Sequence, residues 1–452
     1  MINTLYLPEL REMLAENDSV GLRDFCEALN PVRAAEFMSG LDSAQTWQVI
    51  LQRSIESRVD IFSYLDADKK IEILETCPVD EVAELVAGLP PDDRVDLLQG
   101  IDAGRLNKLL ALLPIEERRD FQRLSQYPEE TAGAVMTTEI ARLTEDLTTH
   151  EALNEIARQI EEYETIYYLY VVDADDRLRG IVSARQLLAG MRQPETRLRD
   201  IMESDLVLAR VDEDQEDVAN KVAKMDLLAI PVVDAQHKLL GIITHDDVID
   251  VVREEATEDA HRIGAVDPLD ESYLRTSLLT LSWKRGIWLA FLFFFALITT
   301  IALDSYENVM DQWKWLMAFI PLVISSGGNS GSQSATLIIT ALSRKHIEVN
   351  DLMKVVAREL SVGLLLGSAL GMMGLIASFF IVPTGLAPTA FLIIPLTLLA
   401  VVICGTLIGS VLPITFESIG WDPAIMSTPL VAGIVDIIGI VIYVNLAIWM
   451  LG

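Results

Sequence analysis

The chain of 452 residues has only three cysteines and five histidines. The cysteines, Cys26, Cys77 and Cys404, lie far apart and form no C-x-x-C pair, so the sequence predicts neither a zinc site nor a disulfide framework. It also offers no nucleophile paired with a base and no metal-ligand cluster of histidines and cysteines. These absences argue against an enzyme.

Basic residues are scarce as well, with 35 Lys and Arg against 67 Asp and Glu and a formal net charge of -32. Duplex binding requires clustered Lys and Arg that displace counterions from phosphates, so this balance argues against a nucleic-acid partner. It favours cations instead. The N-terminal residues also lack a basic stretch followed by an apolar core, and we therefore expect no cleaved signal peptide.

Charge is unevenly divided along the chain. Residues 283–452 have seven Lys and Arg and nine Asp and Glu, which leaves 28 basic and 58 acidic residues, a net charge of -30, for residues 1–282. Hydrophobic residues make up 51% of the whole. The sequence therefore predicts an acidic soluble half joined to an apolar membrane half.

Residues 1–130 repeat a dipeptide every twelve positions, an apolar residue followed by one that favours helix starts. The repeat comprises Leu29-Asn30, Leu41-Asp42, Leu65-Asp66, Cys77-Pro78, Leu89-Pro90, Ile101-Asp102 and Leu113-Pro114, with one register missed at Arg53-Ser54. Asn, Asp, Ser and Pro satisfy or dispense with the free N–H groups of a first helical turn. Units this short cannot bury an apolar face alone, so we expect an N-terminal α-helical superhelical domain.

Residues 131–252 contain a second repeat with a longer period. Residues 170–173 are echoed by 231–234, and residues 178–183 by 239–244, both with an offset of 61 residues. Each copy reads as helix, β-branched strand, acidic turn, strand and closing helix. This arrangement resembles a tandem pair of α/β CBS domains, at 131–198 and 199–252. The resemblance implies modules that associate side by side and sense small ligands.

Residues 253–280 are charged, with a break at Pro268, and we expect a connector (plug) helix at the cytosolic membrane surface there. Beyond it, residues 281–452 hold five apolar segments that approach or exceed the roughly 20 residues needed to cross a bilayer. They are 287–303, 315–342, 360–382, 388–412 and 425–451. The sequence thus predicts a multidomain membrane protein with a C-terminal all-α bundle of five transmembrane helices.

Basic residues indicate how these segments are oriented. They precede the first segment and flank the loop between the second and third, at Lys284, Arg285, Arg344, Lys345, Lys354 and Arg358. Such residues concentrate on the cytosolic side of a membrane. We therefore expect an integral protein of the plasma or inner membrane, with the N-terminal domains in the cytosol and, given an odd number of spans, the C-terminus outside.

Asp436 stands near the middle of the last apolar segment. A carboxylate at that depth is costly and usually faces the bundle interior or a watery cavity. No basic residue lies in any of the five segments to neutralise it. Ala432, Gly433 and Gly439 would let oxygen ligands and a hydrated cation approach. The alternative is a structural aspartate that is hydrogen-bonded to a neighbouring helix.

The second apolar segment is interrupted by Pro321 and by the polar, glycine-rich run 325–334. Such a run at membrane depth is expected only where the backbone is buried in protein or lines a water-filled path. Asn329 and Gln333, four residues apart, share one helical face and are candidates to line a pore. Close helix packing through glycines is the main alternative. An anion-binding glycine loop is disfavoured because the P-loop lysine is missing.

The order of these parts resembles the MgtE family of magnesium transporters. The most specific motifs are PLVISSGGNSGSQSATLIITAL at 321–342 and PLVAGIVDIIGIVIY at 429–443. The resemblance spans essentially the whole chain and implies a homodimeric, magnesium-selective channel with its pore on the dimer axis. It makes Asp436 the pore aspartate. From the residues themselves, we expect Asn329, Gln333, Ala432 and Gly433 to line the pore.

Two positions depart from the family pattern. Ser332 and Thr428 stand where asparagines are expected. If those asparagines help to select the ion, selectivity here would be looser.

Acidic residues between 245 and 259 recur three and four apart, which stacks like charges on one helical face. A solvated acidic surface is the simplest interpretation. The resemblance instead implies regulatory magnesium bound by Glu216, Asp226, Asp247, Asp250, Glu255, Glu258 and Asp259. Candidate ligands opposite them are Asp92 and Asp96 in the N-terminal domain and Asp422 in the last cytosolic loop.

This arrangement suggests a switch. High cytosolic magnesium would draw the acidic domains together and press the connector against the pore, whereas low magnesium would let repulsion separate them. Residues 241–247 also resemble the G-x-x-T-x-x-D pattern with which some CBS domains hold adenosine and ribose, so Thr244 and Asp247 are candidate ATP ligands. The first copy has Ser183 and Gln186 instead.

Two other functions stay open. One is transport of another divalent cation, such as cobalt, nickel or manganese, with CBS-domain regulation. The second is a CBS-regulated channel or exchanger for some other solute. Divalent cations, membrane lipids and a second copy of the chain are the expected partners.

Overall fold

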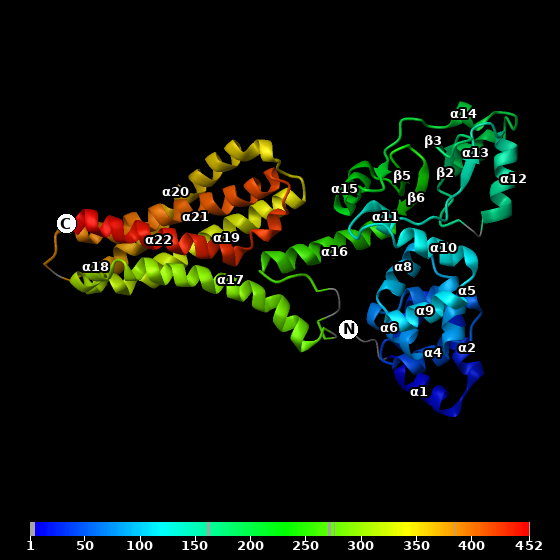
Figure 1. Cartoon of the computed structure of the whole chain (residues 1–452), viewed down its shortest axis with the longest axis horizontal. Coiled ribbons are helices and arrows are strands. Elements are labelled where there is room, and N and C mark those ends of the chain that lie inside the picture. The colour runs from blue at the N-terminus through cyan, green and yellow to red at the C-terminus, as the bar shows by residue number, and fades with distance from the viewer. Residues whose placement is uncertain (1–4, 161–162, 270–272, 275, 384, 452) are drawn as a thin grey trace. The chain divides into compact units, whose positions relative to one another are not determined.

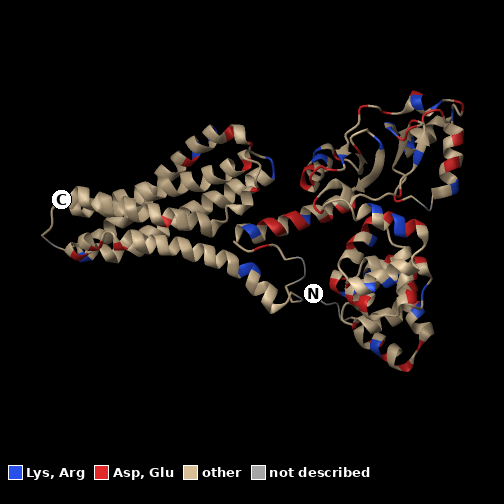
Figure 2. Cartoon of the chain, viewed as in Figure 1, with Lys and Arg blue, Asp and Glu red and all other residues tan. Residues whose placement is uncertain are grey.

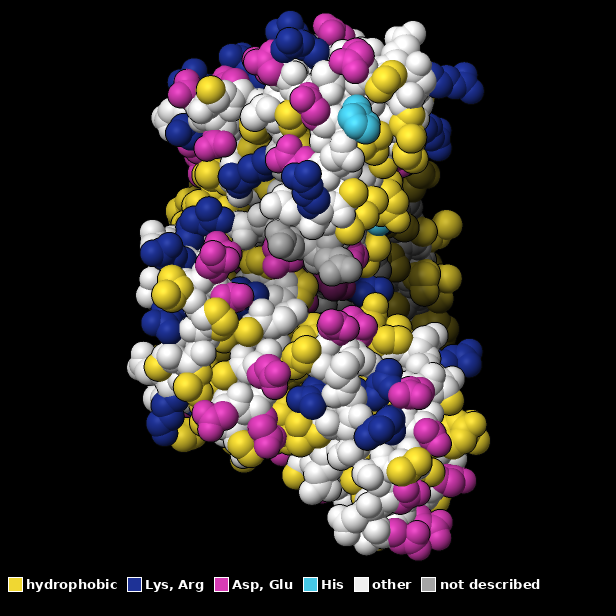
Figure 3. All heavy atoms as spheres, turned by 90° about the vertical axis from the view of Figure 1, so that its right-hand side faces the viewer, with side chains coloured by type: hydrophobic (Ala, Val, Ile, Leu, Met, Phe, Trp, Pro, Cys, Tyr) yellow, Lys and Arg dark blue, Asp and Glu magenta, His cyan; other side chains and the backbone are white. Residues whose placement is uncertain are grey.

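The computed structural model describes residues 5–160, 163–269, 273–274, 276–383 and 385–451. They belong to two compact units, Met1–Arg253 and Glu254–Gly452, which we name the acidic unit and the apolar unit (Figure 1). Charged residues occur throughout the acidic unit and are sparse along the long helices of the apolar unit (Figure 2). On the face in Figure 3, acidic, basic and apolar side chains are interspersed.

Short helices make up the N-terminal part of the acidic unit. They are α1 (Leu7–Glu16), α2 (Ser19–Ala28), α3 (Pro31–Met38), α4 (Ser43–Ile50), α5 (Ile55–Ser63), α6 (Ala67–Thr76), α7 (Val79–Ala87), α8 (Pro91–Gln99), α9 (Ala103–Leu112) and α10 (Ile115–Leu124). From α3 onward, each helix begins directly after a predicted dipeptide, and the missed register at Ser54 also precedes a helix. Helices two places apart pack together: α2 with α4, α3 with α5, α4 with α6, α5 with α7, α7 with α9 and α8 with α10. The predicted helical repeat is confirmed.

Basic side chains tie neighbouring repeats together at helix C-termini, where backbone carbonyls lack partners within the helix. Arg94, the fourth residue of α8, is 2% exposed and donates to three carbonyls at the end of α7, at 2.6 to 3.1 Å. Arg58 and Arg118, the fourth residues of α5 and α10, do the same for the ends of α4 and α9. Lys69 donates to the carbonyl of Met38, the last residue of α3, and to two carbonyls just beyond it. The caps fix each helix against another.

Two copies of a β/α motif follow. The first has β1 (Arg142–Thr144), α12 (Thr149–Gln159), β2 (Tyr168–Val172), β3 (Leu178–Ser183) and α13 (Ala184–Gly190). The second has β4 (Ala209–Arg210), α15 (Gln215–Met225), β5 (Ala229–Val233), β6 (Leu239–Thr244) and α16 (His245–Ile263), and the short helices α11 (Ala132–Val135) and α14 (Leu198–Ile201) precede the copies. In each sheet the first two strands are parallel and the last two antiparallel. The repeat predicted from the sequence is confirmed, with one extra short strand in each copy.

The two copies associate side by side, as the sequence predicted. Backbone bonds join Leu178 to His237 and Leu239 to Asp176, both at 3.0 Å. Buried side chains of both copies, including Tyr170 and Ile242, share one hydrophobic cluster. The N-terminal helices and the second copy share another, so this copy packs directly against the N-terminal helices.

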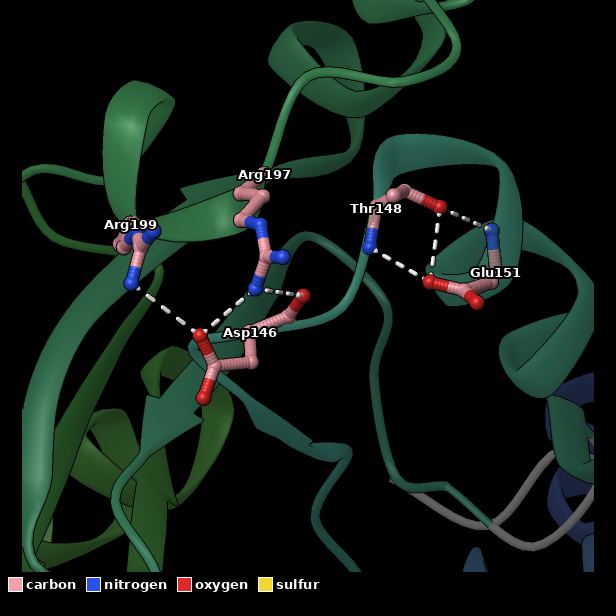
Figure 4. Close-up of polar contacts among 5 residues, drawn as sticks. All are labelled: Asp146, Thr148, Glu151, Arg197 and Arg199. Atoms are coloured by element: carbon pink, nitrogen blue, oxygen red, sulfur yellow. Dashed lines mark hydrogen bonds and ion pairs between the residues drawn. The ribbon is translucent and has the colours of Figure 1, made fainter.

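The segment that links the copies is anchored to the first one (Figure 4). Asp146 accepts hydrogen bonds from Arg197 at 2.9 Å and from Arg199 at 3.2 Å. Next to it, Thr148 and Glu151 form the capping box that begins α12, with Glu151 accepting from the Thr148 amide at 2.9 Å. These contacts hold the end of the first copy against its beginning.

The apolar unit holds long helices: α17 (Leu278–Asp304), α19 (Ile320–Ser343), α20 (Leu352–Ile381), α21 (Ile393–Ser418) and α22 (Thr428–Leu451). Short elements between them are α18 (Glu307–Gln312), η2 (Lys314–Phe319), η3 (Val349–Asp351), η4 (Pro388–Leu392) and η5 (Pro423–Ile425). Among the described residues, four segments are long and apolar enough to cross a membrane: Leu278–Asp304, Val349–Ile381, Pro388–Ser418 and Thr428–Leu451. The predicted segment 315–342 is not among them, because α19 is too polar.

The polar run in that segment does not break the helix. Pro321 lies in the first turn of α19, where its missing N–H has no cost, and residues 325–334 are helical throughout. The glycines serve close packing. A Cβ atom added to Gly405 of α21 would lie 2.6 Å from the carbonyl oxygen of Gly327, and one added to Gly331 would lie 3.1 Å from Val431 of α22. Small residues therefore let α19 sit against α21 and α22.

The predicted connector, 253–280, also differs from the structure. The helix α16 continues from the second CBS copy as far as Ile263, so the connector is an extension of that copy and ends earlier than predicted. Residues 270–272 and 275 lie outside the described residues. The boundary between the two units falls within α16, after Arg253.

Replacing Arg94 by methionine tests the capping arrangement. The variant removes the side-chain donor from the carbonyls of Val86, Ala87 and Leu89. We therefore expect residues 1–253, produced as a fragment, to lose about 3 kcal/mol of unfolding free energy. The control is Arg119→Met, which changes an exposed arginine and should cost less than about 0.5 kcal/mol. Urea unfolding followed by circular dichroism measures both. Equal midpoints for the two variants would contradict the capping role.

Candidate metal sites

The carboxylate of Asp436 is half-buried in α22 and faces α19. A Cβ atom added to Gly328 would lie 3.1 Å from Asp436 Oδ1 and 3.4 Å from the Cβ of Ala432. Both α22 positions, one helical turn apart, therefore face the same glycine. Within the described residues, no hydrogen bond or ion pair reaches the Asp436 carboxylate. Since no Ser, Thr or Asn of a neighbouring helix binds it, this carboxylate is available to a cation.

A polar stripe runs along α19 beside this carboxylate. Ser325, Asn329, Gln333 and Thr336 are all exposed and lie three or four residues apart, so they share one helical face. Asn329 donates to the Ser325 hydroxyl at 3.2 Å. The opposite face, with the glycines, is buried against α21 and α22. The prediction that Asn329 and Gln333 share a face is confirmed, and this face is what makes α19 too polar to pass for an apolar span.

Gly433 occupies a different side of α22 from Ala432. A Cβ atom added to Gly433 would lie 3.3 Å from the Cβ of Phe295 in α17. Ala432 instead faces Gly328. Gly433 therefore fits a role in packing α17 against α22 better than the pore-lining role that the sequence suggested.

In the acidic unit, carboxylates of α8 face carboxylates of α16. Asp92 Oδ1 is buried and, among the described residues, has no hydrogen-bond partner. Asp247 acts electrostatically on Asp92, and Asp250 on Asp93. Lys70 of α6 acts on both Asp93 and Asp250. The structure thus brings together the predicted residues Asp92, Asp247 and Asp250, and adds Asp93 and Lys70, which the sequence analysis missed although Asp93 directly follows Asp92.

Burial and mutual repulsion disfavour the charged forms of these carboxyl groups. Burial raises the pKa of Asp247 to about 6 from an ordinary value of 3.8, and the charges of Asp246 and Asp93 raise it as well. Two hydrogen bonds from Thr244 act in the opposite direction and lower it. Burial, then Asp247 and Asp93, raise the pKa of Asp92 well above its usual range. A proton or a cation would relieve this strain.

Other predicted ligands lie apart from this cluster or on its edge. Asp96 is exposed one helical turn beyond Asp92. Glu216 and Asp226 stand at opposite ends of α15. They are about 15 Å apart along its axis, so the two cannot bind one ion together. Glu255 is partly exposed on α16.

The last turns of α16 bind the apolar unit, to which they belong. Arg262 forms ion pairs with Glu258 of its own helix and with Asp422 in the loop before α22. Asp259 accepts a hydrogen bond from the Ser343 hydroxyl at 2.9 Å. The predicted ligands Glu258, Asp259 and Asp422 are therefore neighbours. Sequence analysis missed Arg262, whose spacing of four from Glu258 and place in a last helical turn are signals for such pairing.

Among the described residues, no three His, Cys, Asp or Glu side chains converge tightly enough to hold a metal ion. The predicted ligands come together as pairs. Mg²⁺ keeps several of its waters and often takes only one or two protein carboxylates. Pairs of carboxylates that face each other across two elements are compatible with such a hydrated ion.

The candidate nucleotide residues already contact each other. Thr244 donates to Asp247 through its hydroxyl and, at 3.2 Å, through its backbone amide. Asp247 thereby caps the start of α16. In the first copy, Ser183 and Gln186 form a capping box at the equivalent place. Asp247 thus caps a helix and is at the same time a candidate metal ligand and a candidate nucleotide ligand.

The raised pKa of Asp247 predicts how the stability of residues 1–253 depends on pH. A carboxyl group whose pKa is higher folded than unfolded stabilises the fold at low pH, and this contribution is lost as pH rises from about 4 through 6. Without divalent cations, we expect the fragment to unfold at less urea at pH 7.5 than at pH 5.5. Asp247→Asn should flatten this dependence, and exposed Asp205→Asn should not. A wild-type fragment that is equally stable at both pH values would contradict the effect.

Family models match three parts of the chain. The MgtE model, described as a divalent cation transporter, matches residues 320–446. The MgtE intracellular N domain matches residues 29–130, and the CBS domain matches residues 132–192 and 198–254.

Relatives match nearly the whole chain. The magnesium transporter MgtE of Thermus thermophilus is 35% identical over 444 residues, 97% of each chain. That of Bacillus subtilis is 32% identical over 338 residues, 75% of this chain and 73% of the relative.

Two solved structures resemble the acidic unit. One is the soluble part of a magnesium transporter, 33% identical, with a TM-score of 0.51 over 55% of this chain and 97% of that one. The other is the cytosolic domain of the Mg²⁺ channel MgtE in complex with ATP, 35% identical, with a TM-score of 0.51 over 54% and 98% of the two chains. The family that the motifs predicted is therefore confirmed: the chain belongs to the MgtE family of divalent cation transporters.

Proposed function

We propose that this chain transports magnesium across a membrane through a pore shared by two copies, and that cytosolic magnesium closes the pore. The observation that carries the proposal is the carboxylate of Asp436, which has no partner within the described residues and faces a glycine of α19. In a membrane, such a carboxylate marks an ion path. The relatives from Thermus thermophilus and Bacillus subtilis are magnesium transporters by name.

Five spans fit this function better than four. The helix α19 has 24 residues and is therefore about 36 Å long, enough to cross a hydrocarbon core of about 30 Å. Its buried face packs on α21 and α22 through glycines. We assign residues 281–452 to the membrane domain, in a plasma or inner membrane, with the C-terminus outside. The other domains are then 1–130, 131–252 and the connector that begins at 253, whose helix ends at Ile263, all in the cytosol.

The polar stripe of α19 supports a pore between two copies. Lipid cannot satisfy Ser325, Asn329, Gln333 and Thr336, so their face requires water or protein. A second copy placed against this face would enclose a polar path with the stripes and Asp436 of both chains around it. Mg²⁺ sheds its waters reluctantly, and amide, hydroxyl and carboxylate oxygens would bind its hydration shell. Ala432, beside Asp436, leaves room for such an ion.

The acidic unit supplies the sensor. Asp92 of α8 faces Asp247 of α16 with one oxygen buried and, among the described residues, without a hydrogen-bond partner. Two carboxylates so placed repel each other until a divalent cation bridges them. Bridging would hold the N-terminal helices on the second CBS copy. Since α16 also ends against the membrane helices, its position transmits the bound state to the pore.

ATP is a further candidate ligand of the CBS pair. The cytosolic domain that resembles the acidic unit was solved in complex with ATP. Thr244 and Asp247 stand in the matching motif, but they bond to each other, so ATP would have to share or displace this contact.

Transport of another divalent cation remains the alternative, since the family description names divalent cations. Nickel and cobalt bind nitrogen ligands more readily than magnesium does, whereas manganese shares the preference of magnesium for oxygen. The candidate pore offers oxygen ligands: Asp436, Asn329 and Gln333. This chemistry favours magnesium over nickel and cobalt, and competition between the ions during flux measurements decides the matter.

The pore assignment predicts the effect of Asp436→Asn. The variant keeps the size of the side chain but removes its charge, and we expect magnesium flux into liposomes to fall about tenfold or more, because the hydrated ion loses its anionic ligand. Asp304→Asn is the matched control: it removes an exposed carboxylate at the end of α17 and should leave flux unchanged. Equal flux in wild type and Asp436→Asn would place the ion path elsewhere.

The sensor assignment predicts the effect of removing residues 1–130. A chain that begins at residue 131 retains the proposed pore but lacks Asp92 and Asp96. We expect its flux at low cytosolic magnesium to equal that of the full chain, and its inhibition by millimolar cytosolic magnesium to weaken because α16 loses its opposing carboxylates. Flux titrated against magnesium on the cytosolic side measures this. Undiminished inhibition would remove the N-terminal domain from the sensor.

A further inference from the structure

We propose that Thr428 and Ser332 couple the connector helix to the pore helix α19, and thereby set how firmly the connector holds the pore closed. They would then act in gating and not in choosing the ion. The inference rests on the proposed function, in which α16 closes the pore. It concerns the two positions where hydroxyl residues replace the asparagines expected from the family pattern.

Two hydrogen bonds in series carry the proposal. The Thr428 hydroxyl donates to the backbone carbonyl of Ile263, the last residue of α16, at 3.2 Å. The Ser332 hydroxyl of α19 donates to the backbone carbonyl of Thr428, the first residue of α22, at 3.1 Å. One residue therefore joins the end of the connector to the start of one membrane helix and the middle of another.

The C-terminus of α16 and the N-terminus of α22 have complementary backbone groups. The last carbonyls of a helix lack partners within it, and Thr428 supplies one for Ile263. After Ile263 the chain turns away, with Ala265 in the left-handed region at a φ of 57°. The negative end of the α16 dipole then faces the positive end of the α22 dipole, which is a favourable arrangement. Only a hydroxyl or amide at the first position of α22 can make this bond.

Other contacts hold the same end of α16 in place. The Ile263 side chain packs on a buried cluster that includes Ala335 and Ile339 of α19 and Val431 of α22. Arg262 pairs with Asp422 just before α22. These contacts position Ile263 beside Thr428. Thr428 adds the polar connection that continues to α19.

The link ends close to the proposed ion path. Asp436 follows Thr428 by eight residues in α22, about 12 Å along the helix. Ser332 is adjacent in sequence to Gln333 of the polar stripe, but it is half-buried and points to α22, whereas Gln333 is exposed. A displacement of α16 would thus act on both helices that carry the proposed pore residues. Both hydroxyls donate to backbone carbonyls, so their donors do not face the ion path.

Thr428→Val tests the link with the full chain in liposomes. Valine keeps the branched shape and removes the hydroxyl, so the closed state loses one hydrogen bond. At a fixed cytosolic magnesium concentration, we expect the ratio of closed to open protein to fall about fivefold. Flux without cytosolic magnesium, and competition by cobalt and nickel, should match the wild type. Thr428→Ser retains the hydroxyl and should restore closing.

Ser332→Ala breaks the second bond from the other side and provides an independent variant if Thr428→Val does not fold. We expect the same direction of change. Thr428→Val or Ser332→Ala proteins that close like the wild type would overturn the inference while leaving the proposed function intact. Altered ion competition with unchanged closing would also overturn it, and would make the hydroxyls selectivity groups. A wild type that cytosolic magnesium does not inhibit would overturn the proposed function itself.

Discussion

Negative charge that lacks a partner cation is the constraint on which both units of this chain depend. In the apolar unit it resides on Asp436, and in the acidic unit on Asp92 and Asp247. Two carboxylates 4 Å apart near a protein surface repel by about 4 kcal/mol, which is a large share of the stability of a typical domain. The conformation at such a contact must therefore depend on whether a cation is present. A protein that moves a cation and is built in this way can respond to its own cargo.

Four basic residues of the N-terminal helices make their hydrogen bonds elsewhere, although Arg94 still interacts electrostatically with Asp92. Arg58, Arg94 and Arg118 bind backbone carbonyls at helix ends, and Lys69 does the same. Their charges stabilise the helical repeat from within. Lys70, next in sequence to Lys69, interacts electrostatically with Asp93 of α8 and Asp250 of α16. The acidic contact thus combines many carboxylates with little built-in compensation, and a mobile cation has to supply the rest.

Local rules predicted the parts that depend on local chemistry. Residues such as Asn30, Asp42 and Asp102 predicted helix starts, because a capping side chain acts within three residues of its own position. The CBS repeat was visible because its strands keep a constant offset. The glycine-rich run left close helix packing as one of several alternatives, and only the neighbouring helices decide for it, because its glycines let α19 approach α21 and α22. Ala432 and Gly433 were grouped together, although adjacent helical residues point about 100° apart.

The contacts between residues distant in sequence could not be predicted. They show that the predicted regulatory carboxylates near the end of α16 differ from those between α8 and α16. Arg262 pairs with Glu258 and Asp422, so a guanidinium already neutralises that corner, and a divalent cation has to displace it before it can bind. Asp92 has one buried oxygen with no such partner in the described part of the chain. Binding a cation there costs no ion pair. In the proposed switch, the contact between α8 and α16 would therefore be the more responsive sensor, and the end of α16 would carry the response to the membrane helices.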